Sequence, residues 1–273
     1  MSNIEELKNI TKQIRTIVLK TCHQVKVGHI GSAFSIADIL AVLYFNILKI
    51  DPQNPTDENR DRLVLSKGHA CSALYATMVL RGFFEEKILM GQFHVDGGML
   101  HGHPVKDAVP GIEVTTGSLG QGFSTATGIA LAAKKLKKNF KTFIISSDGE
   151  CNEGQVWEAV LFAAQQKLDN LVAIIDYNHL QAFGTTKEVL DMDPFAEKFK
   201  SFGWQTAEID GHNFNQIIES LSNLPKDKEK PTAIIAKTIK GKGVSFMENK
   251  LEWHYKWPTD EELVLALKET EQL

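Results

Sequence analysis

Asp148 directly follows the apolar run FIISS, and Asn178 follows the next such run along the chain, LVAIIDY. If both runs are neighbouring strands of a parallel sheet, the two side chains lie together beyond the carboxyl ends, where open α/β sheets bind ligands. Carboxylate and amide oxygens are hard ligands that suit Mg²⁺ or Ca²⁺. A Mg²⁺ site with few protein ligands completes its shell with water and phosphate oxygens. The pattern therefore predicts a metal site with a diphosphate nearby.

A glycine-rich stretch, TTGSLGQG at residues 115–122, is the predicted phosphate cradle. Glycines without a Cβ bring the backbone close to a ligand, and the N–H groups that open a helix favour phosphate oxygens. The order G-x-x-G-x-G, with no acid about 20 residues on, excludes a dinucleotide fingerprint. Alone, S-D-G is an ordinary turn and a glycine-rich helix start indicates tight packing. Their combination favours a diphosphate site.

Four histidines lie in short loop-like stretches: GHIG, KGHA, HGHP and WHY, which contain His29, His69, His103 and His254. Loops on a rigid scaffold commonly carry catalytic groups. Imidazole suits proton transfer because it donates or accepts near neutral pH. For four others an ordinary surface or core position is expected: His23, His94, His179 and His212.

Apolar runs that alternate with helical patterns must position these residues. Strands are predicted at 62–66, 143–146, 171–176, 204–209 and 232–238, and helices at 5–25, 70–82, 117–138, 153–167, 194–202 and 214–224. Residues 26–34 read as a loop, and the next helix is expected to begin at Ser35 with the capping box S-I-A-D. Alternating strands and helices predict an α/β fold, a doubly wound and mainly parallel sheet with helices on both faces. Because too few residues follow Lys237 for a second α/β unit, one domain over 1–273 is expected.

The composition narrows the class of protein. A net charge of −4, spread along 273 residues of which 43% are hydrophobic, disfavours a nucleic-acid or membrane surface. Three cysteines without a C-x-x-C pair argue against a disulfide frame or a zinc site and indicate a reducing compartment. The amino-terminal segment is polar, and no apolar run approaches the ~18 residues of a membrane span. A cytoplasmic protein is therefore expected.

The motifs together resemble a known family. Asp148 and Asn178 resemble the thiamine diphosphate signature, in which G-D-G is followed after about 30 residues by asparagine, with Ser147 in place of the first glycine. The histidine stretches, EVTTGSLGQG, E-G-x-x-x-E-A from Glu153, and KGKGVSFME from Lys240 resemble the amino-terminal domain of transketolase over residues 20–257. Transketolases often have proline where this chain has Ser118, and glycine where it has Tyr255.

The resemblance implies thiamine diphosphate and Mg²⁺ as cofactors, with Ca²⁺ and Mn²⁺ as the alternative ions. The implied metal ligands are Asp148, Asn178 and the backbone carbonyl of Leu180. The implied cofactor contacts are His69, Gly117, Ser118, Leu119, Gly149 and Asn178. The resemblance places His29, His103 and His254 at the substrate, with His29 and His254 as candidates for proton transfer at the cleaved bond and His103 as hydrogen-bond support.

The family takes an essential glutamate from a second domain, which we expect to lie outside these 273 residues. The resemblance therefore implies the amino-terminal subunit of a two-chain transketolase, whose partner carries the pyrimidine-binding domain in a heterotetramer. Such an enzyme transfers a two-carbon ketol unit from a ketose phosphate to an aldose phosphate. Pentose phosphates are the expected substrates, and branched or sulfonated sugars are the alternatives.

Other functions share parts of this pattern. A subunit of a 2-oxo acid dehydrogenase, or a deoxyxylulose-phosphate synthase-like enzyme, has the same metal motif but performs a decarboxylation. A non-catalytic nucleotide- or metal-binding module would explain the glycine-rich helix but not the histidines. The four histidine stretches favour transketolase.

Overall fold

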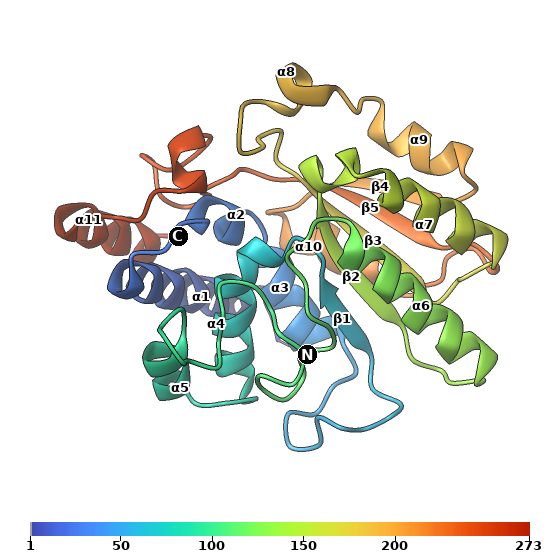
Figure 1. Cartoon of the computed structure of the whole chain (residues 1–273), viewed down its shortest axis with the longest axis horizontal. Helices are drawn as coiled ribbons and strands as arrows, with labels where there is room; N and C mark the ends of the chain where they lie inside the picture. Colours follow the sequence, from blue (N-terminus) through green and yellow to red (C-terminus); the bar gives the residue numbers. More distant parts are fainter. Residues whose placement is uncertain (1) are drawn as a thin grey trace.

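A computed structural model describes residues 2–273 and contains one sheet of five parallel strands in the order β1-β2-β3-β5-β4 (Figure 1). The strands are β1 (Arg62–Leu65), β2 (Thr142–Ser147), β3 (Leu171–Tyr177), β4 (Gln205–Asp210) and β5 (Thr232–Lys237). All five were predicted from the sequence. Because β2 and β3 are neighbours, the segments that follow them emerge side by side at one edge, as predicted for Asp148 and Asn178.

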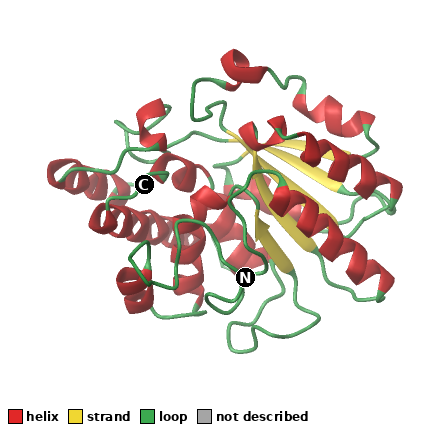
Figure 2. Ribbon diagram, in the orientation of Figure 1, coloured by secondary structure: helices red, strands yellow, loops and turns green. Residues whose placement is uncertain are grey.

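Helices cover both faces of the sheet (Figures 1 and 2). Successive residues of a strand point to opposite faces, so Phe143 and Ile145 of β2 pack into one buried cluster and Ile144 into another. The first cluster includes residues of α1 (Ile4–Val25), α3 (Ala37–Val42), α4 (Cys71–Arg81) and α10 (Phe214–Leu221). The second includes residues of α6 (Gln121–Lys135), α7 (Gly154–Gln165) and α9 (Phe195–Ser201). The predicted doubly wound α/β fold is confirmed.

Several elements were not predicted. They are α5 (Glu86–Gln92), α8 (Thr186–Leu190), α11 (Asp260–Glu271) and single 3₁₀ turns at Gly68–Ala70, Gly149–Asn152 and Leu251–His254. The helix predicted from Ser35 onward is observed as α3 followed by a π-helical turn at Leu43–Ile47. The prediction that 26–34 is a loop was wrong in part, because α2 spans Ile30–Ser35. The capping box at Ser35 was also wrong. Ser35 ends α2 and donates a hydrogen bond to Asp176, and the carboxylate of Asp38 pairs with Arg15 instead of an amide.

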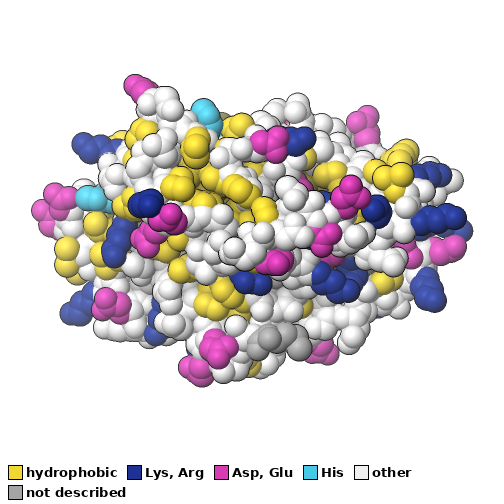
Figure 3. Space-filling model, turned by 90° about the horizontal axis from the view of Figure 1, so that it is seen from below, with side chains coloured by type: hydrophobic (Ala, Val, Ile, Leu, Met, Phe, Trp, Pro, Cys, Tyr) yellow, Lys and Arg dark blue, Asp and Glu magenta, His cyan; other side chains and the backbone are white. Residues whose placement is uncertain are grey.

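The surface carries charges of both signs. Figure 3 shows one face on which lysine and arginine side chains are interspersed with aspartate and glutamate. Among residues 2–273, no helix is both long and apolar enough to cross a bilayer.

Helix α6 approaches the end of β1 closely because its first turn contains Gly122. A Cβ at Gly122 would lie 2.7 Å from the Oγ of Ser66 and 2.8 Å from its Cα. Gly128, two turns along the same helix, has no atom within 4 Å of such a Cβ. The small residues that the sequence shows in this helix therefore have different physical roles.

We expect Gly122→Ala to destabilise the chain by about 1–3 kcal/mol, because the added methyl overpacks a backbone contact. Gly128→Ala is the matched control, and it should stabilise the chain by about 0.5–1 kcal/mol through helix propensity. Urea denaturation of both variants measures the difference. Equal effects of the two substitutions would show that the close approach of α6 to β1 is not constrained by packing.

Candidate functional site

A cavity of about 400 Å³ lies beyond the carboxyl ends of β2 and β3. Nearly all the residues predicted for the site line it: His29, His69, His103, Gly117, Leu119, Asp148, Gly149, Asn178, Leu180 and His254. Ser118 is the exception among them, since its side chain is exposed and does not line the cavity. Segments far apart in the sequence thus converge on one site.

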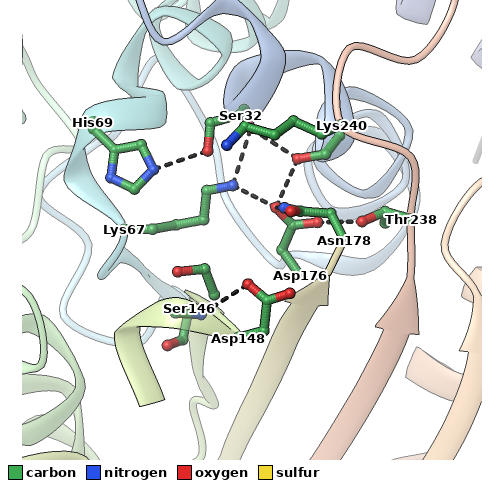
Figure 4. Close-up of polar contacts among 12 residues, drawn as sticks. Ser32, Lys67, His69, Ser146, Asp148, Asp176, Asn178, Thr238 and Lys240 are labelled. Atoms are coloured by element: carbon green, nitrogen blue, oxygen red, sulfur yellow. Dashed lines mark hydrogen bonds and ion pairs between the residues drawn. The ribbon is translucent and has the colours of Figure 1, made fainter. Parts of the chain in front are cut away.

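A buried ion pair lies beneath the cavity (Figure 4). Lys67 follows β1, and its ammonium lies 2.5 Å from a carboxylate oxygen of Asp176 in β3, with both side chains fully buried. Asp176 also accepts hydrogen bonds from Ser35, Thr238 and Asn178. Burial alone would raise the pKa of Asp176, but the Lys67 charge and these donors hold that pKa below its ordinary value. The carboxylate is therefore charged and fixed in place.

Asp148 and Asn178 project from this base toward the cavity. The carboxylate of Asp148 accepts hydrogen bonds from the backbone N–H groups of Gly149 (2.8 Å) and His179 (2.7 Å). The amide nitrogen of Asn178 donates to Asp176, which fixes the orientation of the amide and leaves its oxygen as an acceptor. Burial, and the nearby charge of Asp176, raise the pKa of Asp148 to about 7. A bound cation would offset both effects and favour the charged carboxylate.

The carbonyl of Leu180 already contacts a positive charge. Lys240, in the loop after β5, directs its ammonium to the carbonyl oxygens of Leu180 (3.3 Å) and Gln181 (3.2 Å) and to the Nδ1 atom of His254 (2.8 Å). Burial, and repulsion from Lys67, lower the pKa of Lys240 to about 8. The carbonyl oxygens of Leu180 and Gln181 thus already accept from a protein ammonium group.

Three of the four histidine rings lie close together. The ring centroid of His29 lies 5.2 Å from that of His69, 4.9 Å from that of His254 and 6.5 Å from that of His103. His29 has φ 69° immediately before α2, and its N–H donates to the carbonyl of His254 (2.8 Å). This left-handed backbone conformation is unusual for a residue with a Cβ and occurs often at functional sites.

Burial keeps these rings neutral near pH 7. It is the largest cause that lowers the pKa of His29 to about 4 and that of His254 to about 3, and neighbouring histidines and lysines lower both further. The pKa values of His69 and His103 are lowered for the same first reason. The Nδ1 atom of His29 is buried without a hydrogen-bond partner among residues 2–273. That atom is left for a water molecule or a ligand group to satisfy.

Gly117 and Leu119 of the glycine-rich stretch also line the cavity. Gly117, with φ +147°, approaches the ring of His103 so closely that a Cβ would lie 3.2 Å from it. The N–H of Gly120, just before α6, donates to the buried carboxylate of Glu150 (2.7 Å) instead of facing the cavity. The positive end of the helix dipole of α6 is therefore already matched by a protein carboxylate, which the sequence did not indicate.

The donor set fits a magnesium diphosphate. Among residues 2–273, no group of three or more His, Cys, Asp or Glu side chains is arranged to hold a metal ion. Asp148, the amide oxygen of Asn178 and the carbonyl of Leu180 nevertheless supply hard oxygen donors. An ion with so few protein ligands takes phosphate and water oxygens for the rest of its shell. The buried ammonium groups of Lys67 and Lys240 favour the negative charge of such a group.

Sequence reasoning did not single out four residues of this site: Ser32, Lys67, Asp176 and Lys240. Ser32 lies 2.8 Å from the Nε2 atom of His69, and its carbonyl accepts from Lys67. The available signals were an acid inside the apolar run LVAIIDY and a lysine two residues before His69. Both residue types are rarely buried unless they are paired.

Comparisons with known proteins agree with this geometry. The family model "Transketolase, thiamine diphosphate binding domain" matches residues 6–270. The chain is 43% identical to the 6-deoxy-6-sulfo-D-fructose transketolase subunit SqwG of Clostridium sp. (strain MSTE9), over 98% of this chain and 97% of that protein. It is 40% identical to an apulose-4-phosphate transketolase subunit of Phocaeicola vulgatus, over 98% of this chain and 95% of that protein.

Solved structures extend the comparison to longer proteins. The transketolase from Campylobacter jejuni superimposes with a TM-score of 0.93 at 32% identity, covering 99% of this chain. The chain spans only 43% of the length of that protein.

We expect Lys67→Met to cost about 3–5 kcal/mol in the free energy of unfolding, because it leaves the carboxylate of Asp176 buried without its ion pair. Lys8→Met is the control, since Lys8 pairs with Glu5 at the surface, and it should change stability by no more than about 0.5 kcal/mol. Urea denaturation measures both. A Lys67→Met variant as stable as the control would contradict a structural role for the buried pair.

Proposed function

The chain belongs to the transketolase family, and on this premise we propose that it is the amino-terminal subunit of a two-chain transketolase. In this proposal the assembled enzyme transfers a two-carbon ketol unit from a ketose phosphate to an aldose phosphate, with thiamine diphosphate and Mg²⁺. When bound, thiamine diphosphate supplies a nucleophilic carbon and an electron sink for cleavage of the bond beside a ketose carbonyl. The protein supplies binding, orientation and proton transfer.

One observation carries the proposal: the rings of His29, His69, His103 and His254 surround the same cavity as Asp148 and Asn178. A subunit of a 2-oxo acid dehydrogenase, a deoxyxylulose-phosphate synthase-like enzyme or a non-catalytic binding module needs the metal and glycine motifs but not this set of neutral imidazoles. The named transketolase subunits among its relatives support the same choice.

Asp148, the amide oxygen of Asn178 and the carbonyl of Leu180 are proposed to hold Mg²⁺, with Ca²⁺ and Mn²⁺ as alternatives. Asp176 supports this assignment because its bond to the Asn178 amide nitrogen directs the amide oxygen away from the ion pair. The proposed contacts to the cofactor are His69, Gly117, Ser118, Leu119, Gly149 and Asn178. For Ser118, whose side chain is exposed, the proposed contact is through the backbone.

His29 and His254 are proposed to contact the sugar and to transfer protons at the cleaved bond. Because burial lowers their pKa values to about 4 and about 3, both rings are neutral at pH 7 and can donate or accept hydrogen bonds. The Nδ1 atom of His254 accepts from Lys240, so its proton lies on Nε2, which is a donor. His103 is proposed to add a hydrogen bond to the two-carbon unit.

The proposed partner is a carboxy-terminal transketolase subunit that carries the pyrimidine-binding domain, in a heterotetramer with two copies of each chain. The names of the relatives as subunits, and their match over nearly their whole length, support a separate partner chain, whereas the stoichiometry is part of the proposal alone. We propose that residues 1–273 form one diphosphate-binding domain. The three buried, free cysteines support a reducing compartment, for which we propose the cytoplasm.

Pentose phosphates are the proposed substrates. The names of two relatives specify 6-deoxy-6-sulfo-D-fructose and apulose 4-phosphate, so a sulfonated or a branched sugar is the second candidate. Activity of the assembled enzyme on each of the three sugar classes distinguishes these candidates.

We expect Asp148→Asn to abolish Mg²⁺-dependent binding of thiamine diphosphate while the fold is retained, because the substitution removes the charged ligand and keeps its shape. Calorimetry with the assembled enzyme measures the affinity, and circular dichroism checks the fold. Asp191→Asn, which changes an exposed acid outside the cavity, is the control and should bind normally. Normal binding by Asp148→Asn would contradict the metal assignment.

We expect the chain alone to show no transketolase activity, because a half-site lacks the activating glutamate and the wall that excludes water. Activity should appear when a partner of roughly 300 residues is added, and should reach a plateau at one partner per chain. The measurement is a titration of activity against partner concentration. Full turnover by the lone chain, or a plateau far from one to one, would refute the two-chain proposal.

A further inference from the structure

The loop that carries Lys240 to the cavity, residues 238–243 (the Lys240 loop), is held by a cluster of three polar side chains, two of them buried and one partly exposed. The cluster consists of Arg15 in α1, Asp38 in α3 and His212, which follows β4. Arg15 and Asp38 form a bidentate pair, with N–O distances of 3.2 and 2.9 Å, and both are buried. None of these three residues lines the cavity.

The cluster reaches the Lys240 loop at two points. The backbone N–H of Ile239 donates to the Nε2 atom of His212 at 2.8 Å. The Nε atom of Arg15 donates to the carbonyl of Lys242 at 2.9 Å. These two bonds lie on either side of Lys240, so they fix the segment from which its side chain extends to His254.

The bond from Ile239 indicates which ring nitrogen of His212 accepts and which donates. Because Nε2 accepts an N–H, the ring proton must lie on Nδ1, where it is donated to the carboxylate of Asp38 at 2.6 Å. Burial would raise the pKa of Asp38, but Arg15 and His212 hold it below its ordinary value. The charged carboxylate selects the tautomer of His212 that can accept from Ile239, as carboxylates do for catalytic and metal-binding histidines.

The loop after β4, which carries His212, lies very close to the Lys240 loop. A Cβ at Gly211 would lie 2.5 Å from the Cγ2 atom of Thr238. Glycine therefore allows the loop that carries His212 to lie directly against the start of the Lys240 loop.

We propose that His212 is a positioning residue of the site: with Arg15 and Asp38 it holds the Lys240 loop so that Lys240 stays against His254 and the Leu180 carbonyl. His212 itself touches neither cofactor nor substrate in this account. The predicted effect of His212 on cofactor binding rests on the proposed function. Its effect on the position of the Lys240 loop is independent of that function.

Amide hydrogen exchange of the full chain, without cofactor or partner, tests the hold on the loop. We expect His212→Ala to speed exchange at Ile239 by about tenfold, because one hydrogen bond is lost, while amides of β5 stay protected. His212→Asn keeps a donor for Asp38 but is too short to reach Ile239, and should have the same effect. His212→Gln retains an acceptor that can reach Ile239 and should restore protection. Gly211→Ala should also expose Ile239, because it displaces the loop that carries His212.

His23→Ala is the matched control, because it removes a histidine–aspartate pair, with Asp260, that does not contact the Lys240 loop. It should leave exchange at Ile239 unchanged. Exchange that rises equally throughout the sheet in His212→Ala, or no gain of protection in His212→Gln, would overturn the proposal and make His212 a general stabilising residue.

Calorimetry with thiamine diphosphate and Mg²⁺ on the assembled enzyme tests the consequence for the site. We expect about a tenfold loss of affinity in His212→Ala and His212→Asn, and near-normal affinity in His212→Gln and His23→Ala. Local exposure of Ile239 with unchanged affinity would overturn the positioning role. Failure of the unsubstituted protein to bind thiamine diphosphate would instead refute the proposed function, and the exchange results would still decide whether His212 holds the loop.

Discussion

The buried ion pair of Lys67 and Asp176 is the interaction on which the geometry of the site depends. A charged lysine and aspartate are costly to remove from water, and they are tolerated here because each is paired and hydrogen-bonded. Asp176 accepts from groups in α2 and in the segments that follow β3 and β5, while Lys67 also donates to the carbonyl of Ser32. One carboxylate therefore fixes the relative positions of segments that are far apart in the sequence, and Figure 4 shows its contacts.

The same pair contributes to the electrostatics of the cavity. Burial is the largest cause of the pKa shifts there; in addition, the charge of Asp176 raises the pKa of Asp148, and the charge of Lys67 lowers the pKa values of His29, His69, His254 and Lys240. The site therefore holds a carboxyl group with a pKa of about 7, neutral imidazoles and two buried ammonium groups. A cation beside Asp148 would stabilise its charged form, and an anion beside Lys67 and Lys240 would stabilise the two ammonium groups. A metal diphosphate supplies both charges, which is the physical reason that it fits the site.

The sequence predicted the sheet and the main helices because hydrophobic periodicity depends on local pattern, which a single chain displays. It also placed Asp148 and Asn178 at one edge, since that follows from strand order in a βαβ unit. The prediction of a capping box at Ser35 and Asp38 was wrong, because these side chains contact Asp176 and Arg15 instead of backbone amides. From the sequence, His212 was interpreted as an ordinary histidine, because its spacing does not reveal the contact with Asp38. The helix start at Gly120 was interpreted as a phosphate site, because its spacing does not reveal the contact with Glu150.

The most direct test of these conclusions is a crystal structure of the assembled enzyme with thiamine diphosphate and Mg²⁺. We predict that the metal is bound by the carboxylate of Asp148, the amide oxygen of Asn178 and the carbonyl of Leu180. We also predict that the Lys67–Asp176 pair keeps the arrangement seen here, because the pair is the base on which these ligands are held. A metal bound by other residues, or a site that forms only after Asp176 separates from Lys67, would contradict the central role of this pair.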